Sequence, residues 1–172
     1  QPSLTPIVPT CYDFYLFAHL GGHDHERELI LKLVSTKRYQ RFCRIRELNG
    51  SYGWDPAKRY CWSTTTMPYF HGFFGFADAS FAPSRFLLYL DLVSRYPGAG
   101  EIPWFLQGLQ HLEKYRVGTD RYCFPASYVP ERKTGYYLYS GSMMGLGETG
   151  KKRLEVESTF RMLSMKRNAG VA

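Results

Sequence analysis

The sequence predicts a single, mostly α domain, spanning residues 1–172, that is built from repeated helical hairpins. The first reason lies in residues 102–124, where apolar residues recur at three- and four-residue steps and so share one stripe of a helix. The second reason is that an aromatic loop follows this helix at once, and that much of the chain repeats the same order. The third reason is composition, because 44% apolar and 17% aromatic residues can build a real core and argue against disorder.

Composition also limits the function. No apolar run reaches the roughly 18 residues that a membrane-spanning helix needs, and the N-terminus lacks a signal pattern. The net charge of +7 permits anionic partners without requiring them. Four widely spaced Cys without a CxxC pair favour buried free thiols and a reducing, cytoplasmic location. Because the chain begins at Gln1 and not at Met, we expect processing, truncation or a longer parent chain.

The N-terminal part predicts an arm followed by helices. Three Pro in residues 1–10 predict an extended arm. The apolar run of residues 11–20 predicts a short buried helix, with a strand as the alternative. After the break at Gly21-Gly22, Asp24 is expected to cap a second helix. That helix should continue, or restart at Ser35-Thr36, as far as Asn49-Gly50. Its expected apolar stripe is Leu29, Ile30, Leu33 and Val34.

The middle of the chain predicts an inner helix and two clearer ones. The small and aromatic residues of 62–78 predict an inner helix from about Pro68, although the three adjacent Thr favour extended structure locally. Residues 84–96 predict a helix that Ser84 caps and Pro97-Gly98 ends. In the helix of residues 102–116, Glu101 and Pro103 suit the first turn and Gly118 suits the end. Its expected stripe is Ile102, Phe105 or Leu106, Leu109, Leu112 and Tyr115.

The C-terminal part predicts a long loop and a final helix. Residues 117–135 contain Pro125, Pro130 and Gly135 and are expected to form the loop. Residues 136–147 resemble the small and aromatic segment near residue 70, and close helix packing explains their glycines. The last helix is expected over residues 154–167, with Val156, Phe160 and Leu163 facing inward and Asn168-Ala169-Gly170 at its end.

Two parts of the chain show internal sequence similarity. Residues 34–54 match residues 104–124 at an offset of 70 without a gap, so that Tyr52 meets Tyr122 and Trp54 meets Phe124. Repeated helix pairs stack because each pair buries its apolar face against the next.

The segment Asn49-Gly-Ser-Tyr-Gly-Trp54 and the weaker copy at Phe105-Leu106, Gln110 and 118–124 resemble the helix-to-helix loops of the α/α-toroid superfamily, which includes terpenoid cyclases and protein prenyltransferases. The resemblance covers about residues 27–165. It implies a partial α/α-toroid or solenoid, since a complete ring needs about twice as many helices. Such an arc would pair as a homodimer, belong to a larger parent chain or stay open around an apolar or aromatic cavity.

The catalytic motifs of that superfamily are absent. The sequence contains no DxDD cluster, no DDxxD motif and no convincing Asp-Cys-His zinc set, so it indicates no reaction and no cofactor. The resemblance supports a fold and an apolar or aromatic cavity, and aromatic rings beside basic residues can line a small-molecule pocket. The candidate ligand-binding residues are Tyr52, Trp54, Arg121, Tyr122, Phe124 and Tyr137.

Two acids are the candidates for catalysis. Asp78 and Glu148 follow the two matched inner segments at about the same place, so both are expected near the mouth of a cavity. Exchange of either for its amide should change ligand binding or activity. An enzyme of this kind would be a lyase, a glycosidase or a cyclase-like catalyst.

Other reactive residues have simpler explanations. His23 and His25 are the candidates for metal binding, but side chains at i and i+2 of a helix point apart, and a helix start explains the neighbouring acids. A nucleophilic Cys61 or Cys123 would need a base such as His71 or His111, and packing is the favoured role of both thiols.

The sequence therefore favours a binding or scaffold module with an aromatic-lined cavity for an apolar or carbohydrate-like ligand. The first alternative is the enzyme that uses inner-face acids. The second alternative is a nucleic-acid binder, because tyrosines beside basic residues can stack bases along a charged groove. The residues of that patch are Tyr122, Tyr128, Tyr136, Tyr137 and Tyr139, with Arg121, Arg132 and Lys133. The basic face of Lys37, Arg41 and Arg44 is expected to be solvated.

Overall fold

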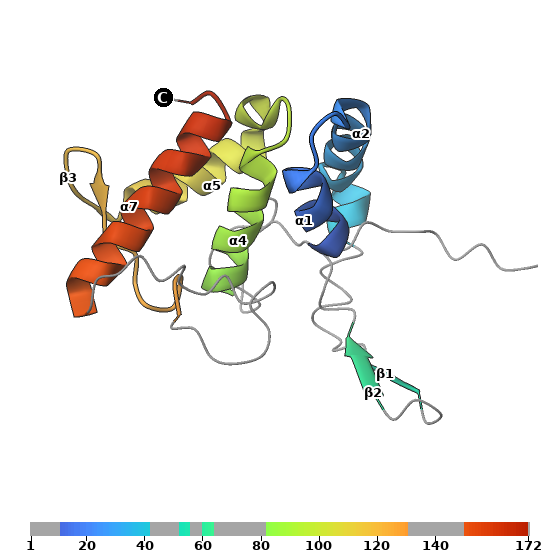
Figure 1. The fold of residues 1–172 in the computed structure, drawn as a ribbon, viewed down its shortest axis with the longest axis horizontal. Coiled ribbons are helices and arrows are strands. Elements are labelled where there is room, and N and C mark those ends of the chain that lie inside the picture. Colours follow the sequence, from blue (N-terminus) through green and yellow to red (C-terminus); the bar gives the residue numbers. More distant parts are fainter. Residues whose placement is uncertain (1–10, 42–51, 56–59, 64–81, 131–149, 172) are drawn as a thin grey trace, which may run out of the picture.

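A computed structural model describes residues 11–41, 52–55, 60–63, 82–130 and 150–171, and within them the protein is mostly α-helical (Figure 1). The helices are α1 (Cys11–His19), α2 (Asp24–Val34), α4 (Pro83–Ser94), α5 (Pro103–Glu113) and α7 (Gly150–Asn168), with a 3-10 helix η3 (Ala99–Glu101). Two antiparallel hairpins pair β1 (Tyr52–Asp55) with β2 (Tyr60–Ser63) and β3 (Arg116–Gly118) with β4 (Arg121–Tyr122). The mostly α prediction is confirmed.

Several predictions concern segments outside the described residues. These are the arm of residues 1–10, the end of a helix at Asn49-Gly50, the inner helix from Pro68 and the segment 136–147. The basic face is described only in part, because Lys37 and Arg41 are described and exposed while Arg44 is not described.

The α4 helix forms the centre of the core and packs against α1, α5 and α7 (Figure 1). The hydroxyl of Tyr96, just after α4, donates to the carbonyl oxygen of Phe14 in α1 at 3.1 Å. The predicted stripe is buried, but the predicted cap is wrong: Ala82 precedes the first turn, and Pro83 occupies it. Pro suits that position because its missing N–H would have no partner there. The buried stripe is Phe86, Leu87, Leu90 and Val93.

The α5 helix agrees closely with its prediction. Pro103 begins it, Phe105 takes the inward position and Leu106 is partly exposed. The predicted end is wrong, because the helix stops at Glu113 and Gly118 lies in β3. The residue with left-handed backbone is instead Asp120 (φ 53°), in the turn between β3 and β4. Asp tolerates this conformation because its short side chain bonds locally.

The α1 segment is a helix, as predicted, but it buries only one side. Phe14 and Ala18 are buried, whereas Tyr15 and Leu16 are exposed. Gly22 adopts a left-handed conformation (φ 78°) and separates α1 from α2, in agreement with the predicted break.

The predicted cap of α2 is wrong, and its predicted apolar face is right only for Val34, which is buried, and for Ile30, which packs against the core. Leu29 and Leu33 are exposed, and Leu31 and Val34 are buried. The buried side of α2 is shifted toward Leu31 from the predicted side, because Leu31 faces the η3–α5 segment. Asp24 is the first helical residue and makes no cap; its carboxylate instead accepts a hydrogen bond from Arg27 at 3.2 Å.

The chain restarts a helix after α2, as one of the two predicted alternatives states. Ser35 ends α2, and residues 37–41 are helical again. Thr36 caps the new helix, since its hydroxyl accepts the backbone N–H of Tyr39 at 3.2 Å.

The α7 helix is present, but its predicted inward face is wrong. Phe160 is 51% exposed and Leu163 is 40% exposed. The helix turns its hydroxyl-bearing side toward β4 because Thr159 Oγ1 and Ser158 Oγ accept the backbone N–H groups of Tyr122 and Phe124. The residues buried with that side are Glu157, Ser158, Arg161, Met162 and Met165.

The predicted end of α7 is confirmed. Gly170 is left-handed (φ 67°), the Val171 N–H donates to the Lys166 carbonyl, and the Gly170 N–H donates to the Arg167 carbonyl. These bonds satisfy the last carbonyl groups of the helix. Among the helices that the structure describes, none combines the length and hydropathy needed to cross a bilayer.

Candidate functional site

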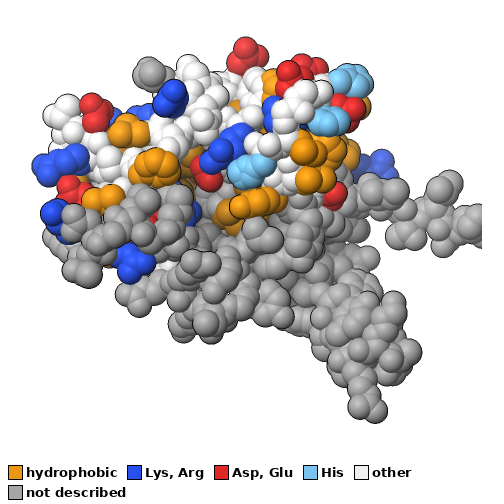
Figure 2. Space-filling view, in the orientation of Figure 1, with side chains coloured by type: hydrophobic (Ala, Val, Ile, Leu, Met, Phe, Trp, Pro, Cys, Tyr) orange, Lys and Arg blue, Asp and Glu red, His pale blue; other side chains and the backbone are white. Residues whose placement is uncertain are grey.

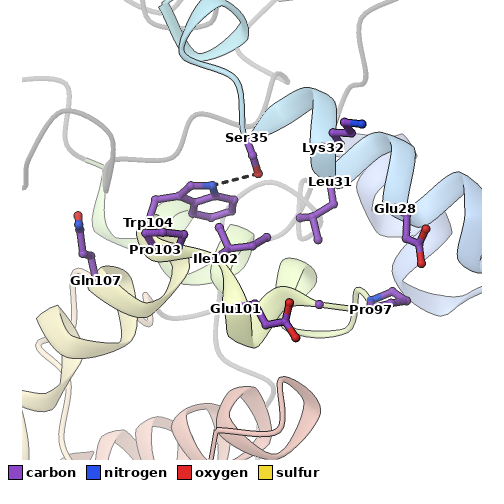
Figure 3. Close-up of a pocket in the computed structure, with 11 residues that line it drawn as sticks. Glu28, Leu31, Lys32, Ser35, Pro97, Glu101, Ile102, Pro103, Trp104 and Gln107 are labelled. Atoms are coloured by element: carbon purple, nitrogen blue, oxygen red, sulfur yellow. Dashed lines mark hydrogen bonds between the residues drawn. The ribbon is translucent and has the colours of Figure 1, made fainter.

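A groove of about 650 Å³ lies between α2 and the segment that leads from η3 into α5 (Figure 3). This volume is in the range of pockets that bind small molecules. Its apolar surface comes from Leu31, Pro97, Ile102, Pro103 and Trp104. Its polar side chains are Glu28, Lys32, Ser35, Glu101 and Gln107.

Local sequence explains how the wall of the groove is shaped. Gly98 is left-handed (φ 75°), which turns the chain sharply after α4. Ile102 is extended (φ −87°, ψ 118°), as expected for a residue that precedes Pro. Pro103 then starts α5, and Trp104 falls in its first turn. The short η3–α5 connection therefore presents Ile102 and Trp104 to α2.

Trp104 joins the two walls. Its indole Nε1 donates to Ser35 Oγ at 3.1 Å, and its side chain is buried (Figure 3). Ser35 is the residue at which α2 ends. This hydrogen bond links the end of α2 to the start of α5.

The groove has two chemically different ends. Figure 3 shows Trp104 and Gln107 at one end, and Glu28 and Glu101 toward the end formed by Pro97. Among the described residues, the carboxylates of Glu28 and Glu101 form no ion pair or hydrogen bond, and neither does the ammonium of Lys32. The two carboxylates remain available to a ligand.

A second cluster surrounds the hydroxyl of Tyr122. This hydroxyl donates to the Glu113 carboxylate at 3.0 Å and accepts from Arg116 Nη2 at 2.9 Å and from Lys166 Nζ at 3.1 Å. Burial on its own would raise the pKa of Glu113, but the hydrogen bonds from Lys166 and Tyr122 outweigh it and lower that pKa. Because these polar groups satisfy one another, the cluster connects α5, β4 and α7 and has a structural role.

A third cluster contains His111. Its Nε2 and the Tyr128 hydroxyl share a hydrogen bond of 2.9 Å, and the Tyr115 hydroxyl donates to the Tyr128 hydroxyl at 3.3 Å. Burial, followed by the nearby ammonium of Lys114, lowers the pKa of His111 to about 4. Burial likewise raises the pKa of Tyr128. The imidazole is therefore neutral at neutral pH.

Cys123 is a half-buried free thiol, in agreement with the prediction of free cysteines. Within the described part of the chain its thiol forms no hydrogen bond, so no Cys–His pair with His111 is present there. His71, the other candidate base, lies outside that part of the chain.

Arg121, Tyr122 and Phe124 are the sequence-predicted ligand residues whose side chains the structure describes, and none of the three lines the groove. Tyr122 and Phe124 are fully buried core residues, so their rings are not accessible to a ligand in this structure. Arg121 is exposed and pairs with Glu155 at 3.1 Å. Tyr52 and Trp54 lie in β1.

Three predicted site residues lie outside the described residues: Tyr137, Asp78 and Glu148. The two histidines proposed for metal binding are exposed at the start of α2, where His23 Nδ1 lies 3.7 Å from Glu26 Oε2 and His25 follows. In the described ranges, no three His, Cys, Asp or Glu side chains are grouped as metal ligands would be.

The surface charges are unevenly distributed. Figure 2 shows Lys and Arg side chains at the end formed by β3 and α7, and acidic and His side chains over α2. The α7 sequence contains six Lys or Arg and two Glu. Two cations at this end form ion pairs, since Lys166 of α7 and Arg116 of β3 both pair with Glu113.

Sequence reasoning did not identify Glu28, Leu31 or Trp104 as site residues. Trp104 belongs to the segment on which the prediction is centred, but only the packing of α2 against α5 gives it a site role. The signal that was available is the Ile102-Pro103-Trp104 run at a helix start. Comparison of the chain with protein-family models, with curated proteins and with solved structures finds no match.

Proposed function

We propose that the protein is a binding module and that the groove between α2 and α5 takes a small, predominantly apolar molecule. The observation that carries the proposal is the groove itself, whose apolar floor and few polar rim groups are typical of small-molecule sites. Trp104 is the aromatic residue among the described residues of this lining, and it is only 6% exposed. Sugar stacking needs an open aromatic face, so the groove favours an apolar ligand over a carbohydrate-like one.

The expected affinity is modest. A two-ring aromatic ligand that buries about 200 Å² of apolar surface gains about 5 kcal/mol. The lost translational and rotational freedom consumes part of this gain, so binding at about 1 mM is expected. Polar contacts at the rim would then set the specificity.

The test uses 1-naphthylmethanol, a neutral apolar probe, and amide chemical shifts in a titration. We expect the shifts to concentrate on α2 and on the η3–α5 segment. The substitution Ile102→Asn should weaken binding at least about fivefold, because it places an amide in the apolar floor. Ile102 is the N-cap of α5, and Asn is favoured at that position, so the fold should be retained.

The matched control is Leu106→Asn, which changes an exposed Leu of α5 outside the groove. The control should bind the probe as the original protein does. Absence of binding at up to several millimolar probe, or equal losses in both variants, would contradict the proposal.

A partial ring of helical hairpins, either an α/α-toroid or a solenoid, is the larger arrangement that we propose around this module. Support comes from the 70-residue offset, which places the helical residues 37–41 on residues 107–111 of α5. The hairpins do not correspond, because Tyr52 lies in the first strand of one and Tyr122 in the second strand of the other. Light scattering coupled to size-exclusion chromatography measures the mass in solution and so tests whether two copies of the chain associate into one ring. A mass of twice 19.9 kDa supports the homodimer, and a stable monomer argues against it.

The two alternative functions receive less support. The enzyme reading depends on Asp78 and Glu148, and it stays a prediction because neither residue is described. The nucleic-acid reading needs exposed rings, but Tyr122 and Tyr128 are buried and their hydroxyls are hydrogen-bonded.

A further inference from the structure

We propose that the groove selects an apolar ligand that carries a cationic group, such as an arylalkylammonium ion, and that Glu28 and Glu101 bind this group. The inference rests on the proposed function, because it specifies the ligand class of the same groove. It begins from the two ends of the groove, one acidic and one aromatic (Figure 3).

The two carboxylates come from opposite walls. Glu28 belongs to α2, and Glu101 is the last residue of η3. Both are exposed, and among the described residues neither has an ion-pair partner. A ligand cation between them would therefore meet two acceptors that no described side chain already occupies.

Lys32, the cation among the described lining residues, does not neutralise this end. Lys32 is one helical turn after Glu28, yet the two side chains form no ion pair. Figure 3 shows the Lys32 amine pointing away from Glu101. The described lining residues carry two negative charges and one positive charge, so they disfavour an anion and favour a cation.

The remaining lining indicates what the cation must be attached to. Leu31, Ile102 and Trp104 extend the apolar floor from the acidic end toward Gln107. A compact metal ion would leave this floor unused and would find only two carboxylates, and no group of three ligands is present among the described residues. An ammonium group on an apolar body matches both parts of the groove.

The test compares three probes that share one ring system: 1-naphthylmethylammonium, 1-naphthylmethanol and 1-naphthylacetate. We expect the ammonium probe to bind about tenfold more tightly than the alcohol, because each exposed charge contact adds a few tenths to 1 kcal/mol. The acetate should bind more weakly than the alcohol. The preference for the cation should shrink at about 1 M NaCl, where exposed charges are screened within about 3 Å.

Three variants separate the groove charges from general electrostatics. Glu28→Gln and Glu101→Gln should each reduce the preference for the ammonium probe about threefold, and the double variant should abolish it, with binding of the alcohol unchanged. Glu26→Gln is the control, because Glu26 is an exposed carboxylate of α2 outside the groove lining. It should leave the preference intact.

The outcomes distinguish the two proposals. Binding of the alcohol in the groove without a preference for the ammonium probe would overturn the cation selection and leave the apolar binding function standing. The cation selection would equally fail if Glu26→Gln reduced the preference as much as Glu28→Gln does. Failure of all three probes to bind in the groove would overturn both.

Discussion

Trp104 and Ser35 are connected across 69 residues by a 3.1 Å hydrogen bond from the indole Nε1 to the Ser35 hydroxyl. Ser35 ends α2, and Trp104 stands in the first turn of α5. Both residues also line the groove. The hydrogen bond therefore holds the two walls of the proposed binding site at a fixed separation.

Loss of this hydrogen bond should destabilise the fold. Ser35→Ala leaves the buried indole N–H of Trp104 without its acceptor, so the free energy of unfolding should fall by about 1–2 kcal/mol. Urea unfolding followed by circular dichroism measures the change. In a Trp104→Phe background the same substitution should cost only a few tenths of a kcal/mol, because no indole N–H is left to satisfy. An equal cost in both backgrounds would mean that Ser35 acts through something other than Trp104.

At the contact between α5 and α4, the effect of Gly108→Ala on stability should depend on the side chain at position 90. A Cβ at Gly108 would lie 2.8 Å from Leu90 Cδ2 and 2.9 Å from Leu90 Cδ1. Since Leu90 is buried, Gly108→Ala should destabilise the protein by about 1 kcal/mol, as overpacking outweighs the better helix propensity of Ala.

The Leu90→Ala background removes the obstructing atoms. There, Gly108→Ala should stabilise the protein relative to Leu90→Ala alone, because the added methyl fills part of the cavity and Ala favours a helix. Thermal unfolding of the four proteins tests this reversal. A destabilising effect of the same size in both backgrounds would show that Leu90 is not the source of the strain.

His111 should make stability depend on pH. Its pKa in the folded protein is lowered to about 4 from an ordinary value of 6.5. The unfolded chain therefore takes up the proton first, and stability should fall as the pH decreases from about 6.5 to 4, with no contribution from His111 above that window. Because the imidazole is partly exposed and screened, we expect a loss of only about 1–2 kcal/mol.

The variant His111→Gln should reduce this pH dependence, measured as urea stability at pH 7 and pH 4.5. His25→Gln serves as the control, because His25 is exposed on α2. If His111→Gln and His25→Gln showed the same pH dependence, the titration of His111 would not be coupled to folding.

Helix positions could be predicted from the sequence more reliably than helix faces. Pro103 and the stripe of Phe105 and Leu109 predicted α5 because both the helix start and the apolar period are local signals. The inward face of α7 was not predictable from its period, since Phe160 is apolar and yet exposed. Ser158 is buried there because it accepts the Phe124 N–H, and such a contact depends on a partner distant in the chain.

The difference between local signals and contacts distant in the chain also explains which site residues could be predicted. Tyr122 was predicted to contact a ligand because an aromatic residue beside Arg is common in binding sites. In the structure its ring is buried and its hydroxyl is hydrogen-bonded to Glu113, Arg116 and Lys166. The groove residues Glu28 and Glu101 gave no sequence signal, because isolated acids at helix surfaces are ordinary. Only the approach of α2 to η3 brings them to one groove.

The carboxylate of Glu113 should be the most costly to remove in the cluster around Tyr122. It pairs with Lys166 Nζ at 2.5 Å and accepts the Tyr122 hydroxyl, so Glu113→Gln removes the negative charge and one of the two acceptor oxygens that these groups share. Allowing for partial exposure and screening, we expect a loss of about 1.5–3 kcal/mol. The comparison variant is Glu155→Gln, whose pairing with the exposed Arg121 should be worth less than about 1 kcal/mol.

The loss should also depend on pH. Because the folded pKa of Glu113 lies below its ordinary value of 4.5, its stabilising contribution is complete above the unfolded pKa and disappears as the pH falls through the folded pKa. The difference in unfolding free energy between the original protein and Glu113→Gln should therefore narrow when urea titrations are moved from pH 6 to pH 3. Equal costs for Glu113→Gln and Glu155→Gln, or a difference that does not change with pH, would show that the ionised carboxylate does not hold α5 to α7.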